Sequence, residues 1–271
     1  MARQVLGDRR GELDQLRLTA VERLLRRDRV MAAIGLFGAT ALAWASLFRM
    51  HSGMGSMGGA GMAMPGMQAW SPLEPLLLLL MWATMMVAMM LPSAAPTILL
   101  VASVLRRRRE HASPAAPTAV FVAGYLVVWT GFSAAAALAQ WGLHEAALLS
   151  PAMASTSPVL GGILLLAAGV YQWLPAKAAC LHHCRSPLGF LGSHWREGGR
   201  GALAMGMTHG LYCLGCCWAL MTLLFVAGVM NLLWVAAIAA LVLVEKVVPA
   251  GPWVSRVAGL AMAGWGLWML A

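Results

Sequence analysis

Long apolar runs dominate this sequence, and short segments that carry most of the arginines separate them. An α-helix needs roughly 20 apolar residues to cross a bilayer. The runs approach or exceed that length at 30–48, 73–105, 119–143, 159–174, 202–229, 232–248 and 253–270. Only 11% of the residues are charged, which is too few to cover the surface of a soluble protein. The sequence predicts an all-α fold, a polytopic transmembrane helical bundle with six or seven spans.

The basic residues gather at the ends of the apolar runs. The formal net charge of +9 is therefore explained by membrane topology, and we expect no nucleic-acid partner. A cytosolic amino terminus places the segments that carry Arg106–Arg109, Lys177, Arg185, Arg196 and Arg200 on the cytosolic side. Arg49 and Arg256 fall outside this pattern. The expected location is a bacterial-type inner (cytoplasmic) membrane, with the lipid bilayer as a partner.

Two segments stand out beside the spans of the transmembrane domain, 30–271. Residues 1–29 hold eight arginines and five acidic residues and predict a cytosolic basic amphipathic arm on anionic headgroups. Residues 49–72 predict a Met/Gly-rich extracytoplasmic loop. Thioethers in such a loop are weak, exchangeable ligands of Cu(I), or the segment is only a Gly-rich linker. The candidates for this secondary metal capture are His51, Met54, Met57, Met62, Met64 and Met67.

Residues 208–221, THGLYCLGCCWALM, combine one imidazole and three thiols within an apolar run. His209 and Cys213 are four residues apart and share a helical face, which Cys216 or Cys217 continues. Imidazole and thiolate form a soft-metal ligand set that suits Cu(I) or Zn(II). Free cysteine also packs as a small hydrophobic residue, so ordinary core packing is the alternative. The helical period turns Cys216 and Cys217 about 100° apart, so we expect one ligand and one packing residue, or a helix distorted at Gly215.

Methionines line the run 73–105. Met85 and Met89 lie near one helical face with Pro92, whereas Met86 and Met90 lie beside that face. Pro92 and Pro96 should break or kink the helix, and the freed carbonyl groups then need partners inside the bundle. We predict that Met85 and Met89 form part of a metal site.

Residues 175–201 are expected to be a cytosolic Cys/His loop. Its Cys180-Leu-His-His-Cys184 segment holds thiols four residues apart, with His183 beside them. Thiolates and neutral imidazole are ordinary ligands of zinc and copper. Glu245 lies near the inner end of a later run. It is expected either to be a charged partner of a metal, of His209 or of a proton, or to pair with Lys246 at headgroup level.

The chain resembles the family of predicted metal-binding integral membrane proteins known as domain of unknown function 2182. The matching stretches are MWATMMVAMMLPSAAP, LPAKAACLHHCRSPLGFL, MGMTHGLYCLGCCWALM, VMNLLWVA and EKVVP, within residues 75–250. The resemblance implies a multi-span inner-membrane protein that holds metal. The family pattern carries over to Cys180, Cys184, Cys213, Cys216, Cys217 and Glu245.

We therefore interpret the protein as a membrane protein that binds a soft metal, with Cu(I) as the first choice and zinc as the second. It would act in metal transfer, storage or delivery to a cuproenzyme, with a cuproenzyme or metallochaperone as partner, and binding is expected rather than catalysis. One alternative is a membrane thiol–disulfide oxidoreductase that uses Cys180 and Cys184 with Cys213, Cys216 and Cys217. Another is a membrane copper enzyme.

Overall fold

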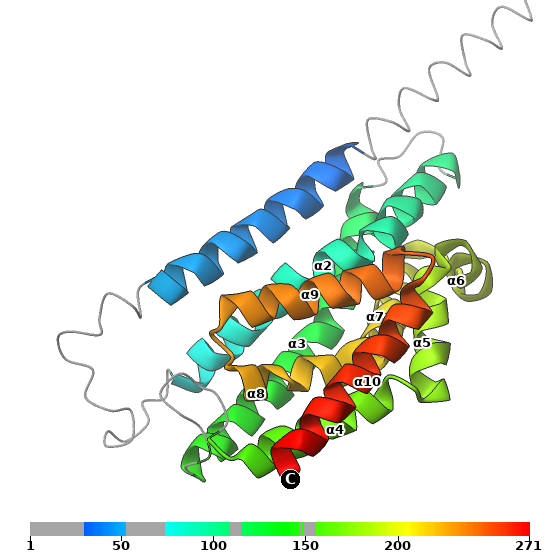
Figure 1. Ribbon diagram of the computed structural model, residues 1–271. Coiled ribbons are helices and arrows are strands. Elements are labelled where there is room, and N and C mark those ends of the chain that lie inside the picture. Colours follow the sequence, from blue (N-terminus) through cyan, green and yellow to red (C-terminus); the bar gives the residue numbers. More distant parts are fainter. Residues whose placement is uncertain (1–29, 53–73, 109–114, 147, 149–155) are drawn as a thin grey trace, which may run out of the picture.

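The computed structural model describes residues 30–52, 74–108, 115–146, 148 and 156–271, and this part of the chain is α-helical with short turns (Figure 1). The all-α prediction is confirmed there. The arm 1–29 lies outside the described residues, as do residues 53–72 of the Met/Gly-rich loop with Met54, Met57, Met62, Met64 and Met67. The helices are Val30–Ser52, α2 Glu74–Arg108, α3 Ala115–Glu145, α4 Pro158–Tyr171, α5 Pro175–Arg185, α6 Pro187–His194, α7 Gly198–Thr222, α8 Leu224–Ala227, α9 Leu232–Val247 and α10 Gly251–Leu270.

Several of these helices are long and apolar enough to cross a membrane. Val30–Ser52, Pro75–Arg106, Ala115–Glu145 and Gly198–Ala227 meet both conditions, and α4 with α5 is a fifth candidate that bends by 64°. The 14 residues of α4 extend about 21 Å at 1.5 Å rise per residue, against a hydrocarbon core of about 30 Å. The described residues thus form a multi-pass membrane protein with four or five candidate spans, fewer than the six or seven predicted.

Two segments are more helical than the sequence predicted. Of the predicted break or kink at Pro92 and Pro96, the break does not occur, because α2 continues through both prolines. Neighbouring helices stabilise this region, and Tyr125 of α3 donates a hydrogen bond to the carbonyl of Met90 at 3.0 Å. Residues 175–201 are also not a plain loop, since α5 and α6 occupy most of them. Pro175 and Pro187 stand in the first turns of these helices, where a missing N–H costs nothing.

Small residues let the helix axes approach closely. A methyl group added at Gly206 of α7 would collide with the carbonyl oxygen of Phe121 in α3, and one at Gly124 would collide with that of Leu203. In the second closely packed pair, α4 and α10, a Cβ at Gly169 would lie 2.7 Å from the carbonyl oxygen of Gly259. This is how helices associate in lipid, where burial of apolar surface provides little driving force.

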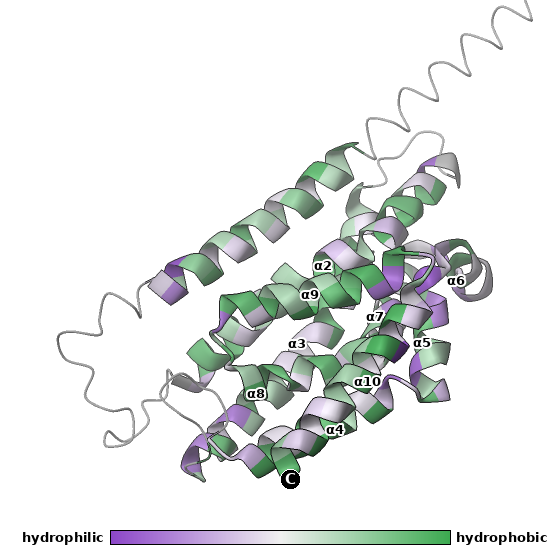
Figure 2. Ribbon diagram, in the orientation of Figure 1, coloured by the Kyte–Doolittle hydropathy of each residue, from purple (hydrophilic) through white to green (hydrophobic). Residues whose placement is uncertain are grey.

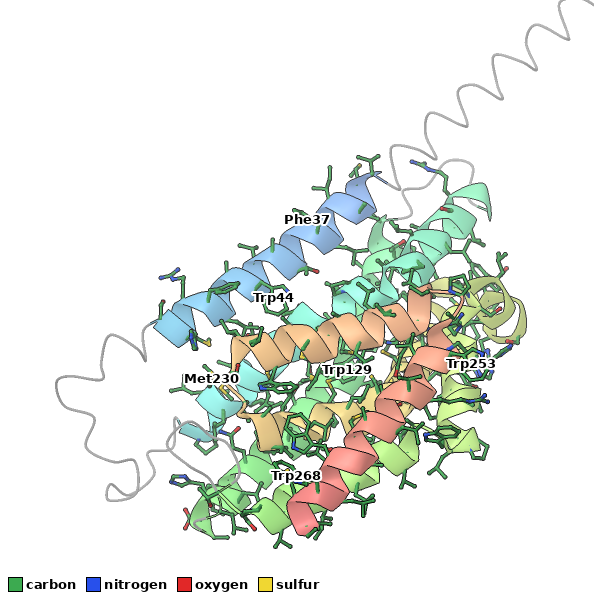
Figure 3. All side chains as sticks on the ribbon, viewed as in Figure 1. Phe37, Trp44, Trp129, Met230, Trp253 and Trp268 are labelled. Atoms are coloured by element: carbon green, nitrogen blue, oxygen red, sulfur yellow. The ribbon has the colours of Figure 1, made fainter. Side chains whose placement is uncertain are left out.

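Most of the described basic side chains lie at one end of the bundle. We call it the arginine end, defined by Lys177, Arg185, Arg196, Arg200 and Arg256, and Figure 2 shows hydrophilic residues gathered around α5 and the adjoining ends of α9 and α10. Arg256 belongs to this end because its guanidinium lies 5.8 Å from the ring centre of Trp173. The sequence analysis placed Arg256 outside the charge pattern, whereas the structure places it within that pattern. Along the helices, Phe37 and Trp268 are 77% and 76% exposed and point away from the bundle, as lipid-facing side chains do (Figure 3).

Candidate metal centre

The cysteine-rich face of α7 is enclosed by other helices. His209, Cys213, Cys216 and Cys217 each expose at most 2% of their surface. The helix runs without interruption from Gly198 to Thr222, so it is not unwound at Gly215. Packing of α3, α5 and α9 around α7 allows neighbouring positions on different faces to be buried together.

Four helices, α2, α3, α7 and α9, come together around the thiol of Cys213. The hydroxyl of Tyr125 in α3 lies 3.1 Å from its Sγ, and the ammonium nitrogen of Lys246 in α9 lies 3.0 Å from the same atom. Lys246 also donates to Ser93 of α2 at 2.9 Å. The ammonium group is the donor to this sulfur, whereas the Tyr125 hydroxyl gives its proton to the Met90 carbonyl.

The two following cysteines lie directly beside Cys213. The thiols of Cys216 and Cys217 donate to the Cys213 carbonyl oxygen at 3.1 and 3.0 Å. The Sγ of Cys217 also lies 3.8 Å from the Sδ of Met90 in α2. A thioether of α2 therefore joins the thiols of α7.

Helix α5 brings the remaining cysteines to the same place. The buried thiol of Cys184 lies near the thiols of Cys213 and Cys216 and interacts with them electrostatically. Cys180, one turn earlier, packs against Gly215, where its Sγ would lie 2.7 Å from an added Cβ. All five cysteines are free thiols. We name the group of Cys184, Cys213, Cys216, Cys217 and Met90 the sulfur cluster.

The two charged neighbours Glu245 and Lys246 face different partners. Glu245 forms a buried ion pair with Lys177 of α5 at 2.7 Å and accepts a hydrogen bond from Gln172 at 3.2 Å. Gln172 also accepts from Lys177, and Arg185 donates to the backbone carbonyl of Glu245 at 2.6 Å. The Glu245–Lys246 pair considered from the sequence does not form, because the helix turns Lys246 towards Cys213 instead.

His209 lies one turn before Cys213, among aromatic rings. Its ring centre is 5.1 Å from that of Phe190, 5.8 Å from that of Tyr125 and 6.0 Å from that of Phe121. Its Nδ1 is buried and has no hydrogen-bond partner among the residues that the structure describes. Burying a ring nitrogen without a hydrogen-bond partner costs free energy. This nitrogen therefore offers either a lone pair or an N–H group beside the sulfur cluster.

A second group of histidines lies at the arginine end, between α5, α6 and α7. His183 stacks on Tyr212 with ring centres 4.1 Å apart and planes 3° apart, and the ring centre of His194 is 6.2 Å from that of His183. His182 is exposed. We name His183, His194 and Tyr212 the histidine rim.

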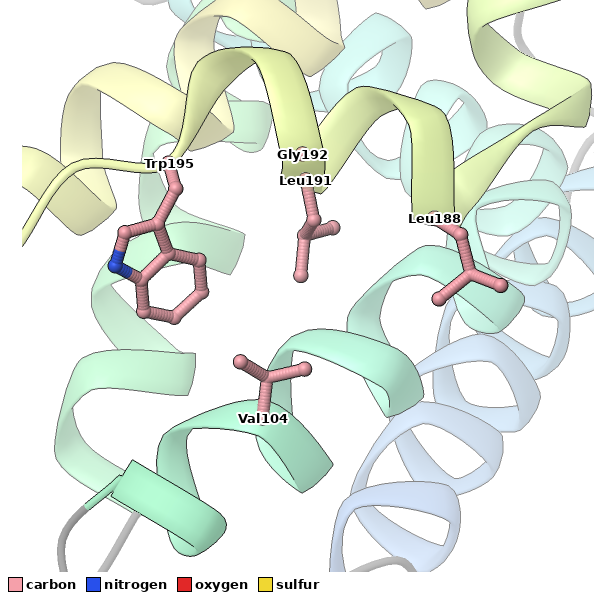
Figure 4. A pocket seen from close by; sticks show the side chains of 5 residues that line it. All are labelled: Val104, Leu188, Leu191, Gly192 and Trp195. Carbon is pink, nitrogen blue, oxygen red and sulfur yellow. The ribbon is translucent and has the colours of Figure 1, made fainter.

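A pocket of about 230 Å³ lies between α2 and α6 (Figure 4). Its lining is mainly apolar and comprises Val104, Leu188, Leu191, Gly192 and Trp195. It includes none of the predicted metal ligands, so the sulfur cluster is a closed site within the bundle rather than the wall of this pocket.

The donors in the sulfur cluster are soft, and soft thiolates and thioethers select Cu(I). Residues 79–269 match the PpoB2 family, which is described as a copper chaperone. The chain belongs to the PpoB2 copper-chaperone family. Membership agrees with the resemblance to metal-binding membrane proteins and implies copper binding. No curated protein and no solved structure matches the chain.

The PpoB2 match contains the whole sulfur cluster and the histidine rim but not the arm or the Met/Gly-rich segment. Within the described ranges, no three His, Cys, Asp or Glu side chains are arranged to hold a metal ion together.

The predicted site residues of this PpoB2 protein separate into groups. Cys184, Cys213, Cys216 and Cys217 come together, with His209 one turn away and Cys180 against Gly215. His183 lies in the histidine rim, and Glu245 pairs with Lys177. Met85 and Met89 are buried in the core, but the methionine that contacts a cysteine is Met90. His51 is exposed at the end of Val30–Ser52 that lies away from the arginine end (Figure 1).

Sequence reasoning missed four residues that contact the sulfur atoms or their partners: Met90, Ser93, Tyr125 and Lys246. Two features of the sequence indicate some of these residues. Met86, Met90 and Ser93 form a stripe at helical spacing, next to the predicted stripe of Met85 and Met89. Lys246 is a cation near the end of an apolar run, and such residues usually have a functional partner.

Proposed function

We propose that the protein binds Cu(I) in the sulfur cluster and delivers it to a copper enzyme. The observation that carries this proposal is that the buried thiols of Cys213, Cys216 and Cys217 lie together beside the thioether of Met90 and the ammonium group of Lys246. Family membership indicates that the metal is copper, and the contacts indicate which residues bind it.

Cys184 and Cys213 are the proposed first pair of ligands. Cu(I) accepts two sulfur ligands in a linear arrangement, whereas structural zinc almost always takes four in a tetrahedron. Cys216 adjoins both thiols and would be the next donor, with Cys217 and Met90 behind it. Copper is thus preferred over the zinc alternative.

Charge balance supports the same pair. Two thiolates and one Cu(I) carry a net charge of −1, which is costly in a buried site without a counter-charge. The ammonium of Lys246 touches Cys213 and supplies that charge. The adjacent Glu245–Lys177 pair fixes the end of α9 and so keeps Lys246 turned towards the thiol.

The exposure of the cysteines supports a proposal for the end of the bundle at which copper leaves. Cys184 lies on a short helix at the arginine end and exposes 9% of its surface, more than the 1% exposed by each cysteine of α7. We propose that this end faces the cytosol of a bacterial-type inner membrane. Capture on the opposite side would use His51 with the methionines of the Met/Gly-rich segment, and Met85 and Met89 would be intermediate stations.

The test is copper content after loading detergent-purified protein with one equivalent of Cu(I) under reducing conditions. The parent should retain nearly one copper per chain, and the Cys184→Ser and Cys213→Ser variants should lose most of it. Cys180→Ser is the matched control and should retain copper at equilibrium, because this thiol packs on Gly215.

One result would move the assignment to thiol–disulfide exchange. In that case the parent protein would bind no copper but would reversibly form and break a disulfide among these cysteines. Free thiols within reach of one another are the requirement for such exchange. Catalytic oxygen consumption by the copper-loaded parent would instead indicate a copper enzyme.

A further inference from the structure

The histidine rim has a geometry that packing alone does not require. The Nδ1 atom of His183 lies 2.9 Å from the carbonyl oxygen of Ala179, in its own helix. The Nδ1 atom of His194 lies 3.3 Å from the carbonyl oxygen of Phe190 and 2.8 Å from the hydroxyl of Ser193. A ring N–H that donates to a carbonyl fixes the tautomer and leaves Nε2 with its lone pair. In both rings Nε2 is then the nitrogen that carries the lone pair and could bind a metal ion.

The spacing of the two rings suits one shared metal ion. Two imidazoles that bind one ion linearly, through nitrogens at about 2.0 Å, have ring centres roughly 6 Å apart. The centres of His183 and His194 are 6.2 Å apart. The hydroxyl of Tyr212 forms a long hydrogen bond with Nε2 of His194, at 3.5 Å, and a metal ion bound at that nitrogen would replace it.

A line of rings joins the histidine rim to the sulfur cluster. His194 stacks on Phe190 with ring centres 5.0 Å apart, and Phe190 lies 5.1 Å from His209. His209 is 2% exposed, with an unpartnered Nδ1, and its ring is 5.8 Å from Tyr125, which contacts Cys213. The buried unpaired nitrogen of His209 therefore lies between the two groups, where a passing ion would meet a ligand.

We propose that His183 and His194 form a second Cu(I) site at the arginine end, through which copper enters or leaves the sulfur cluster. Imidazole is a less soft ligand than thiolate, so this site is weaker and exchanges faster than the cluster. His209 is the intermediate ligand on the route. The proposal rests on the proposed function, because the histidine rim would exchange copper with the sulfur cluster.

The test uses full-length protein with one and then two equivalents of Cu(I), followed by X-ray absorption spectroscopy at the copper edge. In the parent, the first equivalent should show sulfur ligands and the second should add nitrogen ligands. The His183→Leu/His194→Leu variant should keep the first and lose the second. Its transfer of copper to a soluble Cu(I) chelator should be about tenfold slower or more, within the range that loss of supporting ligands produces.

His182→Leu is the matched control, because it removes the exposed neighbour of His183 and should leave both equivalents in place. Nitrogen ligation and transfer rate that are unchanged in the double variant would overturn the proposal, as would an equal loss in His182→Leu. The sulfur-bound first equivalent reports that each variant is folded. Its absence from the parent would contradict the proposed function itself, and the two failures are thereby distinguished.

Discussion

The ammonium nitrogen of Lys246 lies 3.0 Å from the sulfur of Cys213, inside a bundle whose other buried lysine is already paired. Lys177 is neutralised by Glu245, whereas Lys246 contacts no carboxylate in the part of the chain that the structure describes. Its partners are Cys213 and Ser93. A thiolate at Cys213 would therefore supply the counter-charge that this buried cation needs.

Replacing Lys246 by Met should weaken Cu(I) binding about tenfold to a hundredfold, because hydrogen bonds to charged groups contribute about 1.5–3 kcal/mol. The measurement is competition with a Cu(I) chelator of known affinity. Arg256→Gln is the control, since it removes a cation from the same end whose contacts are with tryptophan rings. Equal affinity in Lys246→Met and the parent would show that Lys246 does not balance the charge of the site.

Met90→Leu should lower Cu(I) affinity several-fold and leave the fold intact, because leucine fills a similar volume but has no sulfur. The same competition assay measures it. Met89→Leu is the matched control: Met89 is the preceding residue in α2 and is also buried, with 2% exposed. If Met89→Leu had the larger effect, the predicted stripe of Met85 and Met89 would be the ligand face after all.

The sequence predicted the helices and the cysteine-rich face of α7 for simple physical reasons. Apolar runs of bilayer length must be helical, and a spacing of four residues places His209 and Cys213 on one face. The meeting of the α7 thiols with Tyr125, Met90 and Lys246 depends on how four helices are rotated and shifted against one another. One sequence holds no direct record of that register, so the contact of Met90 with Cys217 could not be predicted, and a ligand role of Met85 and Met89 stays a prediction.

The remaining errors also have local causes. Helices α5 and α6 have 11 and 8 residues and are rich in His, Ser and Gly, so residues 175–201 were expected to be a loop. The span count was too high because short runs such as α4 were treated as full crossings. Glu245 was assigned either to metal or to Lys246, since its true partner, Lys177, lies 68 positions away in the sequence.

Glu245→Gln should destabilise the protein by about 3–5 kcal/mol, because it leaves the buried ammonium of Lys177 without its counter-charge. Thermal unfolding in detergent measures the effect. The double variant Glu245→Gln/Lys177→Met should recover part of the loss. Both variants should still bind one copper per chain when folded, and a specific loss of copper with normal stability would instead make Glu245 a ligand.

Gly206→Ala should destabilise the packing of α3 on α7 by about 1–3 kcal/mol, because the added methyl group meets the backbone carbonyl of Phe121 and neither helix can yield locally. The control is Gly131→Ala on an exposed position of α3, where nothing lies within 4 Å. That change should be neutral or slightly stabilising, since alanine favours helix. Equal melting temperatures for the two variants would contradict the close approach.

The most direct test of the copper assignment is X-ray absorption spectroscopy of the parent loaded with one equivalent of Cu(I), compared with Cys213→Ser. We expect sulfur neighbours at roughly 2.2–2.3 Å, similar to thiolate distances at zinc. We also expect that signal to disappear in Cys213→Ser. Copper bound in the parent through nitrogen or oxygen alone, or an unchanged spectrum in Cys213→Ser, would contradict a copper site built on Cys213.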